Sequence, residues 1–144
     1  MQLPCRRFGR TNLKMPVLSL GGMRFQKSWD QLKYSEIPPK EQNKVENILN
    51  LTNKFGLNHV ETAKYYGSSE VQLGMGFKST NYMPKIIQTK IPPNSDPKLF
   101  EEELLESFEK LQVKKIDLLA IHGINLPEHL NQAVRDGGCI SILK

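Results

Sequence analysis

The sequence has few cysteines, few aromatic residues and no long apolar run, and each shortage excludes a class of protein. Cys5 and Cys139 are its two cysteines, and neither belongs to a Cys-x-x-Cys or Cys/His spacing, so we expect two reduced thiols and no metal site. No apolar run is long enough to span a bilayer, and residues 1–15 lack the apolar segment of a signal peptide. We therefore expect a cytoplasmic protein that does not enter membranes.

The charge does not indicate a nucleic-acid partner. The 144 residues carry a formal net charge of +5, but acidic and basic residues are interleaved along most of the chain. The densest basic patch, formed by Arg6, Arg7 and Arg10, has no nucleic-acid-binding motif beside it. A hydrophobic content of 38% is typical of a globular protein, and we expect one domain over residues 1–144.

Short apolar runs alternate with segments of helical spacing. The runs at residues 17–20, 57–60, 85–88 and 116–121 predict four buried strands. Helical periodicity and capping signals predict helices over residues 45–55, 68–76, 97–111 and 126–134. A hairpin is expected around the turn at residues 9–12, and a long loop over residues 25–43. Strands that alternate with helices form parallel βαβ units, so the fold class is α/β.

Polar side chains follow the predicted strands at similar intervals. Glu61 follows the second strand, Lys90 follows the third 29 positions later, and His122 follows the fourth after a further 32 positions. Because parallel strands end at one edge of a sheet, we expect these side chains to converge there. Tyr66, in the loop after Glu61, can reach the same opening. Any one of these residues alone is better explained as a solvated or packed side chain, but their repetition at one level favours a site.

Several segments, taken in order, resemble the aldo/keto reductase family. They are RFGRT at residues 7–11, LGGMR at 20–24, NHVETAKYYGSSE at 58–70, IQTK at 87–90, SFEKL at 107–111 and IDLLAIH at 116–122. The resemblance extends over essentially the whole chain. It implies a (β/α)₈ TIM-type barrel, truncated here to about the first four βα units after an N-terminal β-hairpin, since a complete barrel takes about 250 residues.

The resemblance also implies an activity, the NADP(H)-dependent reduction of aldehyde or ketone carbonyls to alcohols. The family uses an Asp, Tyr, Lys and His tetrad; Tyr66, Lys90 and His122 match the last three positions, and Glu61 stands where the family has Asp. Tyr66 would protonate the carbonyl oxygen, with Lys90 favouring its phenolate. Glu61 would hold Lys90 in place, and His122 would orient the carbonyl. The added methylene of Glu61 extends its reach by about 1.5 Å, and we expect it to lower the activity.

The cofactor and partners follow from the same resemblance. Gly22, Met23 and Arg24 match the family's first contacts with NADP(H), and Gly22 has no Cβ to block a close approach. The substrate would be a small-molecule carbonyl compound. An alternative is a catalytically inactive half-barrel that acts as an interaction partner. Its open strand edges would permit self-association, including the pairing of two copies into an eight-stranded barrel.

Overall fold

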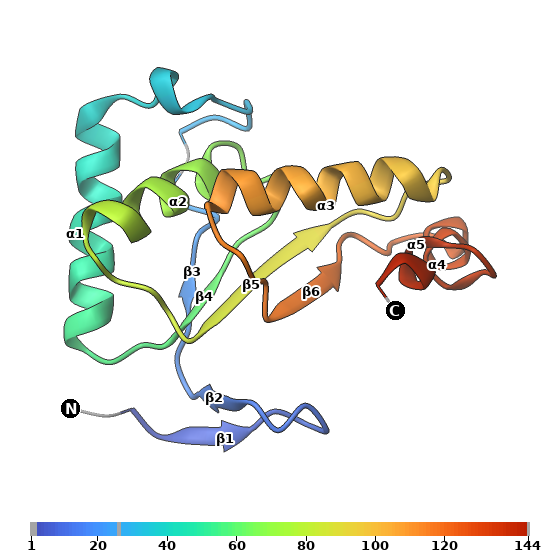
Figure 1. Cartoon of the computed structure of the whole chain (residues 1–144), viewed down its shortest axis with the longest axis horizontal. Coiled ribbons are helices and arrows are strands. Elements are labelled where there is room, and N and C mark those ends of the chain that lie inside the picture. The colour runs from blue at the N-terminus through green and yellow to red at the C-terminus, as the bar shows by residue number, and fades with distance from the viewer. Residues whose placement is uncertain (1–2, 26, 144) are drawn as a thin grey trace.

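A four-stranded parallel sheet organises the fold. The computed structural model describes residues 3–25 and 27–143, and Figure 1 shows α1, α2 and α3 along one side of its sheet. The strands lie side by side in the order β3 (Leu20–Gly21), β4 (His59–Glu61), β5 (Ile86–Ile91) and β6 (Leu118–Ile121). Neighbours in the sheet are also neighbours in the sequence, and a helix lies between each pair, as parallel pairing requires. The predicted α/β architecture is confirmed.

The described residues contain five α-helices beside the sheet. They are α1 (Pro39–Lys54), α2 (Ser69–Ser79), α3 (Pro97–Leu111), α4 (Pro127–Val134) and α5 (Cys139–Ile142). The predicted start of α3 is confirmed, because the Asp96 side chain accepts a hydrogen bond from the backbone N–H of Lys98 at 3.0 Å. Within the described part of the chain, no helix is both long and apolar enough to cross a membrane.

An antiparallel hairpin precedes the sheet, as predicted. Its strands are β1 (Cys5–Arg7) and β2 (Lys14–Pro16), with Arg6 opposite Met15. Figure 1 places the hairpin near the end at which the parallel strands begin. The predicted buried strand at residues 17–20 is wrong for most of its length, since Val17 and Leu18 are exposed. The reason is that the backbone N–H of Val17 bonds to Pro4 O and prolongs the hairpin, so that only Leu20 of this apolar run enters the sheet.

The predicted loop at residues 25–43 is also shorter than expected. A single 3₁₀ turn, η1, occupies Tyr34–Glu36, and α1 begins at Pro39. Proline suits the first helical position because it needs no backbone N–H there. The predicted cap at Ser68 is right in position, but its hydroxyl donates to Gln72 Oε1 at 2.9 Å and caps no backbone N–H.

The glycines of α2 permit close packing of helices. A Cβ on Gly74 would lie 2.2 Å from the backbone oxygen of Lys110 in α3, and one on Gly76 would lie 2.4 Å from a methyl carbon of Leu49 in α1. The sequence predicted that these glycines weaken the helix. The structure shows why α2 contains them: they let it lie directly against its two neighbours.

The two faces of the sheet differ in chemistry, because successive side chains of a strand point to opposite faces. Val60 and Ile87 face the helices and share a core with buried residues of α1, α2 and α3, namely Val45, Leu49, Leu73, Phe77 and Leu111. The alternate positions of β4 and β5 carry polar side chains: His59, Glu61, Gln88 and Lys90. The face turned away from the helices is therefore polar, and it leads to the carboxyl ends of the strands.

Candidate functional site

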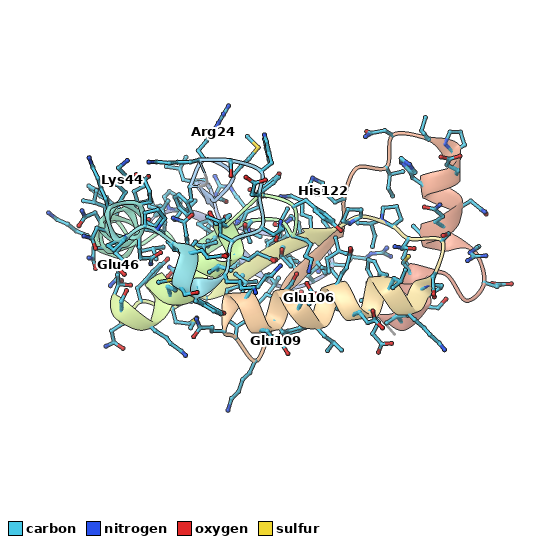
Figure 2. The ribbon with its side chains drawn as sticks, turned by 90° about the horizontal axis from the view of Figure 1, so that it is seen from above. Arg24, Lys44, Glu46, Glu106, Glu109 and His122 are labelled. Atoms are coloured by element: carbon cyan, nitrogen blue, oxygen red, sulfur yellow. The ribbon has the colours of Figure 1, made fainter. Side chains whose placement is uncertain are left out.

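The four predicted catalytic side chains come from consecutive strand ends. Glu61 is the last residue of β4, and Lys90 is the penultimate residue of β5. His122, labelled in Figure 2, follows β6 directly, and its backbone N–H donates to Ile91 O at 2.8 Å. Tyr66 lies in the loop between β4 and α2. The parallel strands thus bring all four residues to one edge of the sheet.

The ammonium group of Lys90 has a partner for each of its three N–H bonds. It forms an ion pair with Glu61, donates to the backbone oxygen of Thr62 at 2.9 Å, and donates to the phenol oxygen of Tyr66 at 3.3 Å. An ammonium group can only donate, so the oxygen of Tyr66 is the acceptor in this contact. The phenol's own hydrogen is therefore left for another acceptor.

The ring of Tyr66 lies between two other aromatic side chains. Its centroid is 5.6 Å from that of His122 and 6.4 Å from that of Trp29, and both contacts are edge-to-face. Trp29 comes from the segment between β3 and α1 and is 64% exposed. The half-buried phenol thus has an imidazole on one side and an exposed indole on the other.

Burial tunes the two basic groups of the site. It lowers the pKa of Lys90 to about 8, and Glu61 forms an ion pair with the ammonium group. Burial also lowers the pKa of His122, and the charge of Lys90 lowers it further. At neutral pH the site therefore holds a charged lysine and a neutral imidazole.

Glu61 reaches Lys90 despite being one methylene longer than aspartate. Its Oε1 atom pairs with the ammonium, and its Oε2 atom lies toward Gly21, where an added Cβ would come within 3.5 Å. That distance is an ordinary van der Waals contact, so the carboxylate of Glu61 packs beside Gly21 without crowding. The ion pair forms with glutamate in this position, and the expected loss of activity stays a prediction.

The segment predicted to contact the cofactor follows β3. Both backbone polar groups of Gly22 form hydrogen bonds within the protein. Its N–H donates to Glu61 O at 2.7 Å, and its oxygen accepts from Ser69 Oγ at 2.9 Å. A Cβ on Gly22 would lie 2.6 Å from Ser69 Oγ, so packing alone requires glycine there. Met23 is half-buried, and the exposed Arg24 extends outward in Figure 2. An exposed guanidinium group suits a phosphate-bearing cofactor, and the predicted contacts stay predictions.

An open groove of about 420 Å³ includes His122 in its wall. Its other lining residues come from the loops after β4, β5 and β6 and from α4: Tyr65, Pro92, Pro93, Gly123, His129 and Gln132. Two prolines and a tyrosine give the groove an apolar component, while the two histidines supply polar groups. A small organic molecule in this groove would have His122 at one of its ends.

Sequence reasoning missed two contributors to this site. Thr62 acts through its backbone oxygen, which leaves no signature in the sequence. Glu70 is almost completely buried behind the site, although its place in the first turn of α2 is typical of an exposed acidic residue.

Comparison with known proteins identifies the same set of relatives by two routes. Residues 17–136 match the model of the aldo/keto reductase family. A solved structure from Pseudomonas aeruginosa, described as an aldo-keto reductase, is 23% identical and has a TM-score of 0.77 over 99% of this chain. An aldo/keto reductase from Brucella melitensis is 18% identical, with a TM-score of 0.66 over 100% of the chain. At these identities, the structural matches show the fold alone.

A third solved structure of similar fold contains a bound cofactor. An aldo-keto reductase from Bombyx mori, solved in complex with NADP, is 22% identical and has a TM-score of 0.59 over 84% of this chain. The matches cover 57%, 49% and 38% of the three neighbours, so the chain spans about half the length of these proteins or less. No curated protein sequence matches the chain significantly.

Proposed function

The chain belongs to the aldo/keto reductase family, and we propose that its site reduces an aldehyde or ketone to an alcohol with NADPH. The observation that carries this proposal is the bonding of Lys90, whose ammonium group donates to Tyr66 and leaves the phenol hydrogen free to be transferred. The ion pair with Glu61 supports the charge on Lys90. The site thus combines a proton donor with a cation that stabilises the donor's conjugate base.

The reaction needs a hydride and a proton. NADPH, when bound, supplies the hydride to the carbonyl carbon. Negative charge then develops on the carbonyl oxygen, and the O–H bond of Tyr66 breaks as its proton passes to that oxygen. The resulting phenolate lies 3.3 Å from the Lys90 ammonium, which stabilises it until a solvent proton restores the phenol.

His122 orients the substrate. Its imidazole is neutral at pH 7 because burial and the charge of Lys90 both lower its pKa, so one ring nitrogen donates and the other accepts. An N–H donor beside Tyr66 can hold the carbonyl oxygen within reach of the phenol. The groove that begins at His122 would hold the remainder of the carbonyl compound. On the cofactor's side, Met23 and Arg24 are the residues of this chain that would contact NADPH.

Cellular location is a further part of the proposal. The two cysteines are both free thiols, one exposed and one buried. Free thiols suit a reducing compartment, which supports the cytoplasm as the place where the protein works.

Binding of NADPH to the purified chain tests the proposal first. Trp29 is the chain's single tryptophan and lies 6.4 Å from the Tyr66 ring, so bound NADPH should quench its fluorescence by energy transfer. We expect saturable quenching that survives in Tyr66→Phe, while Trp29→Phe removes the signal. A folded chain that gives no quenching and shows no binding by calorimetry would contradict the proposal.

The same purified chain can also distinguish the enzyme from the alternative, a catalytically inactive half-barrel that acts as an interaction partner. Strands β3 and β6 form the two edges of the described sheet, and edge strands can pair with another chain. Light scattering would give the molar mass. A dimer that binds NADPH would support an assembled active site, whereas a folded protein that associates without binding NADPH would favour a non-catalytic interaction partner.

A further inference from the structure

The loop that carries Tyr66 is anchored to α3 by the side chains just before it. The ammonium group of Lys64, 4% exposed, forms an ion pair with Glu106, which is labelled on α3 in Figure 2. The hydroxyl of Tyr65 donates to the carboxylate of Glu103, one turn earlier on the same helix. Residues 64 and 65 are therefore both fixed to α3, immediately before the phenol of the site.

A third anchor follows Tyr66 and lies on the far side of the sheet. Glu70, in the first turn of α2, is 1% exposed. Its carboxylate accepts from Thr89 Oγ1 at 2.6 Å and from Ser107 Oγ at 3.2 Å. Burial raises the pKa of Glu70, and the two hydroxyl groups and nearby lysines oppose that shift. A carboxylate buried this deeply is costly unless its hydrogen bonds are made.

Thr89 connects this anchor to the reacting groups. It precedes Lys90 in β5, and successive strand residues point to opposite faces, so Thr89 bonds to Glu70 behind the sheet while Lys90 bonds to Tyr66 in front. On the loop side, only three residues lie between Tyr66 and Glu70. The backbone N–H of Ser69 donates to Tyr66 O at 3.0 Å, which makes this connection a tight turn. One side chain thus links the Tyr66 loop to the Lys90 strand.

We propose that Glu70 is a positioning residue for the Tyr66–Lys90 pair, holding the phenol and the ammonium group in register through its bond to Thr89. The inference rests on the proposed function, in which the reaction depends on that pair. Glu70 touches neither reacting group. It acts by keeping the loop closed over Lys90, whose side chain is 18% exposed in the closed arrangement.

The substitution Thr89→Val tests this link without changing any charge. Valine keeps the shape of threonine but cannot donate to Glu70. If the bond holds the loop in place, its loss exposes Lys90 to water, and the pKa of Lys90 should rise from about 8 toward its ordinary value by about half a unit or more. NMR titration of isotope-labelled lysine side chains measures this pKa, and Lys90→Arg identifies the resonance.

Ser107→Ala is the matched control. It also removes one hydroxyl donor from the carboxylate of Glu70, but this donor lies on α3 and not beside Lys90. We expect Lys90 to titrate at about 8 in this variant. An unchanged pKa of Lys90 in Thr89→Val, or an equal shift in both variants, would overturn the proposal, because the first shows no link and the second shows only general destabilisation.

Glu70→Gln provides a second measurement if Thr89→Val does not fold. Removal of a nearby negative charge would by itself lower the pKa of Lys90, whereas an opened loop would raise it. The sign of the shift therefore decides whether Glu70 acts by positioning the loop or only through its charge. A rise supports positioning, and a fall overturns it. These titrations need neither NADPH nor turnover. A failure of NADPH binding would therefore count against the proposed function, but the titrations would still show whether Glu70 positions the loop.

Discussion

Replacement of Glu61 by glutamine should reduce the charge of Lys90 at neutral pH. Burial lowers the pKa of Lys90 to about 8, and Glu61 is the carboxylate paired with its ammonium group. An opposite charge in contact typically raises the pKa of a lysine, by about 1–3 units. Because glutamine has nearly the same shape but no charge, Glu61→Gln should lower the pKa of Lys90 relative to the wild type.

The consequence for the reaction follows from the fraction of charged lysine. The proposed mechanism needs the ammonium group beside the phenolate. The rate of reduction at pH 7 should therefore fall in Glu61→Gln in proportion to the charged fraction of Lys90, by up to about tenfold, and part of it should return as the pH is lowered toward 6.

NMR titration of the lysine side chains measures the effect directly. Glu101→Gln makes the same chemical change on the exposed face of α3 and should leave Lys90 titrating at about 8. If Lys90 has the same pKa in Glu61→Gln and in the wild type, the reasoning is refuted, because the carboxylate would then contribute nothing to the charge of the lysine.

Two further predictions concern stability. The hydroxyl of Tyr82 donates to Leu57 O and the side chain is 4% exposed, so Tyr82→Phe should lower the free energy of unfolding by about 1–3 kcal/mol in urea titrations at pH 7. Burial raises the pKa of Tyr82 to about 12, and the unfolded phenol loses its proton first, so wild-type stability should decline between about pH 10 and 12 and decline less in the variant. Gly74→Ala would place a Cβ 2.2 Å from Lys110 O and should lower the free energy of unfolding by about 1–3 kcal/mol in thermal or urea denaturation. A stabilised Gly74→Ala protein would contradict the close contact between α2 and α3.

The convergence of the site residues could be predicted because it depends only on strand order. Glu61, Lys90 and His122 are about one βα repeat apart, and parallel strands bring such positions to one edge. The bonds between them could not be predicted. Lys90 also donates to Thr62, and the acceptor there is a backbone oxygen, which any residue would provide.

The errors in the predicted elements have local causes. The apolar run at residues 17–20 has the composition of a strand, but the bond from Val17 to Pro4 draws its first residue into the hairpin. The first turn of α1 is polar, begins with Pro39 and follows Pro38, so its helical spacing was not apparent. The role of Glu70 was also hidden, because a carboxylate in the first turn of a helix has an ordinary explanation in the helix dipole.

Transfer of deuterium from NADPH labelled at C4 is the measurement that tests the proposed reaction most directly. The purified chain would be incubated with the labelled cofactor and an aldehyde, and the alcohol product would be examined by mass spectrometry. We expect one deuterium on the former carbonyl carbon, and a yield about 10²- to 10⁴-fold lower in Tyr66→Phe, which lacks the proton donor. A folded chain that binds NADPH but yields no deuterated alcohol, or a Tyr66→Phe variant as active as the wild type, would contradict the assignment of Tyr66 and Lys90 as the reacting pair.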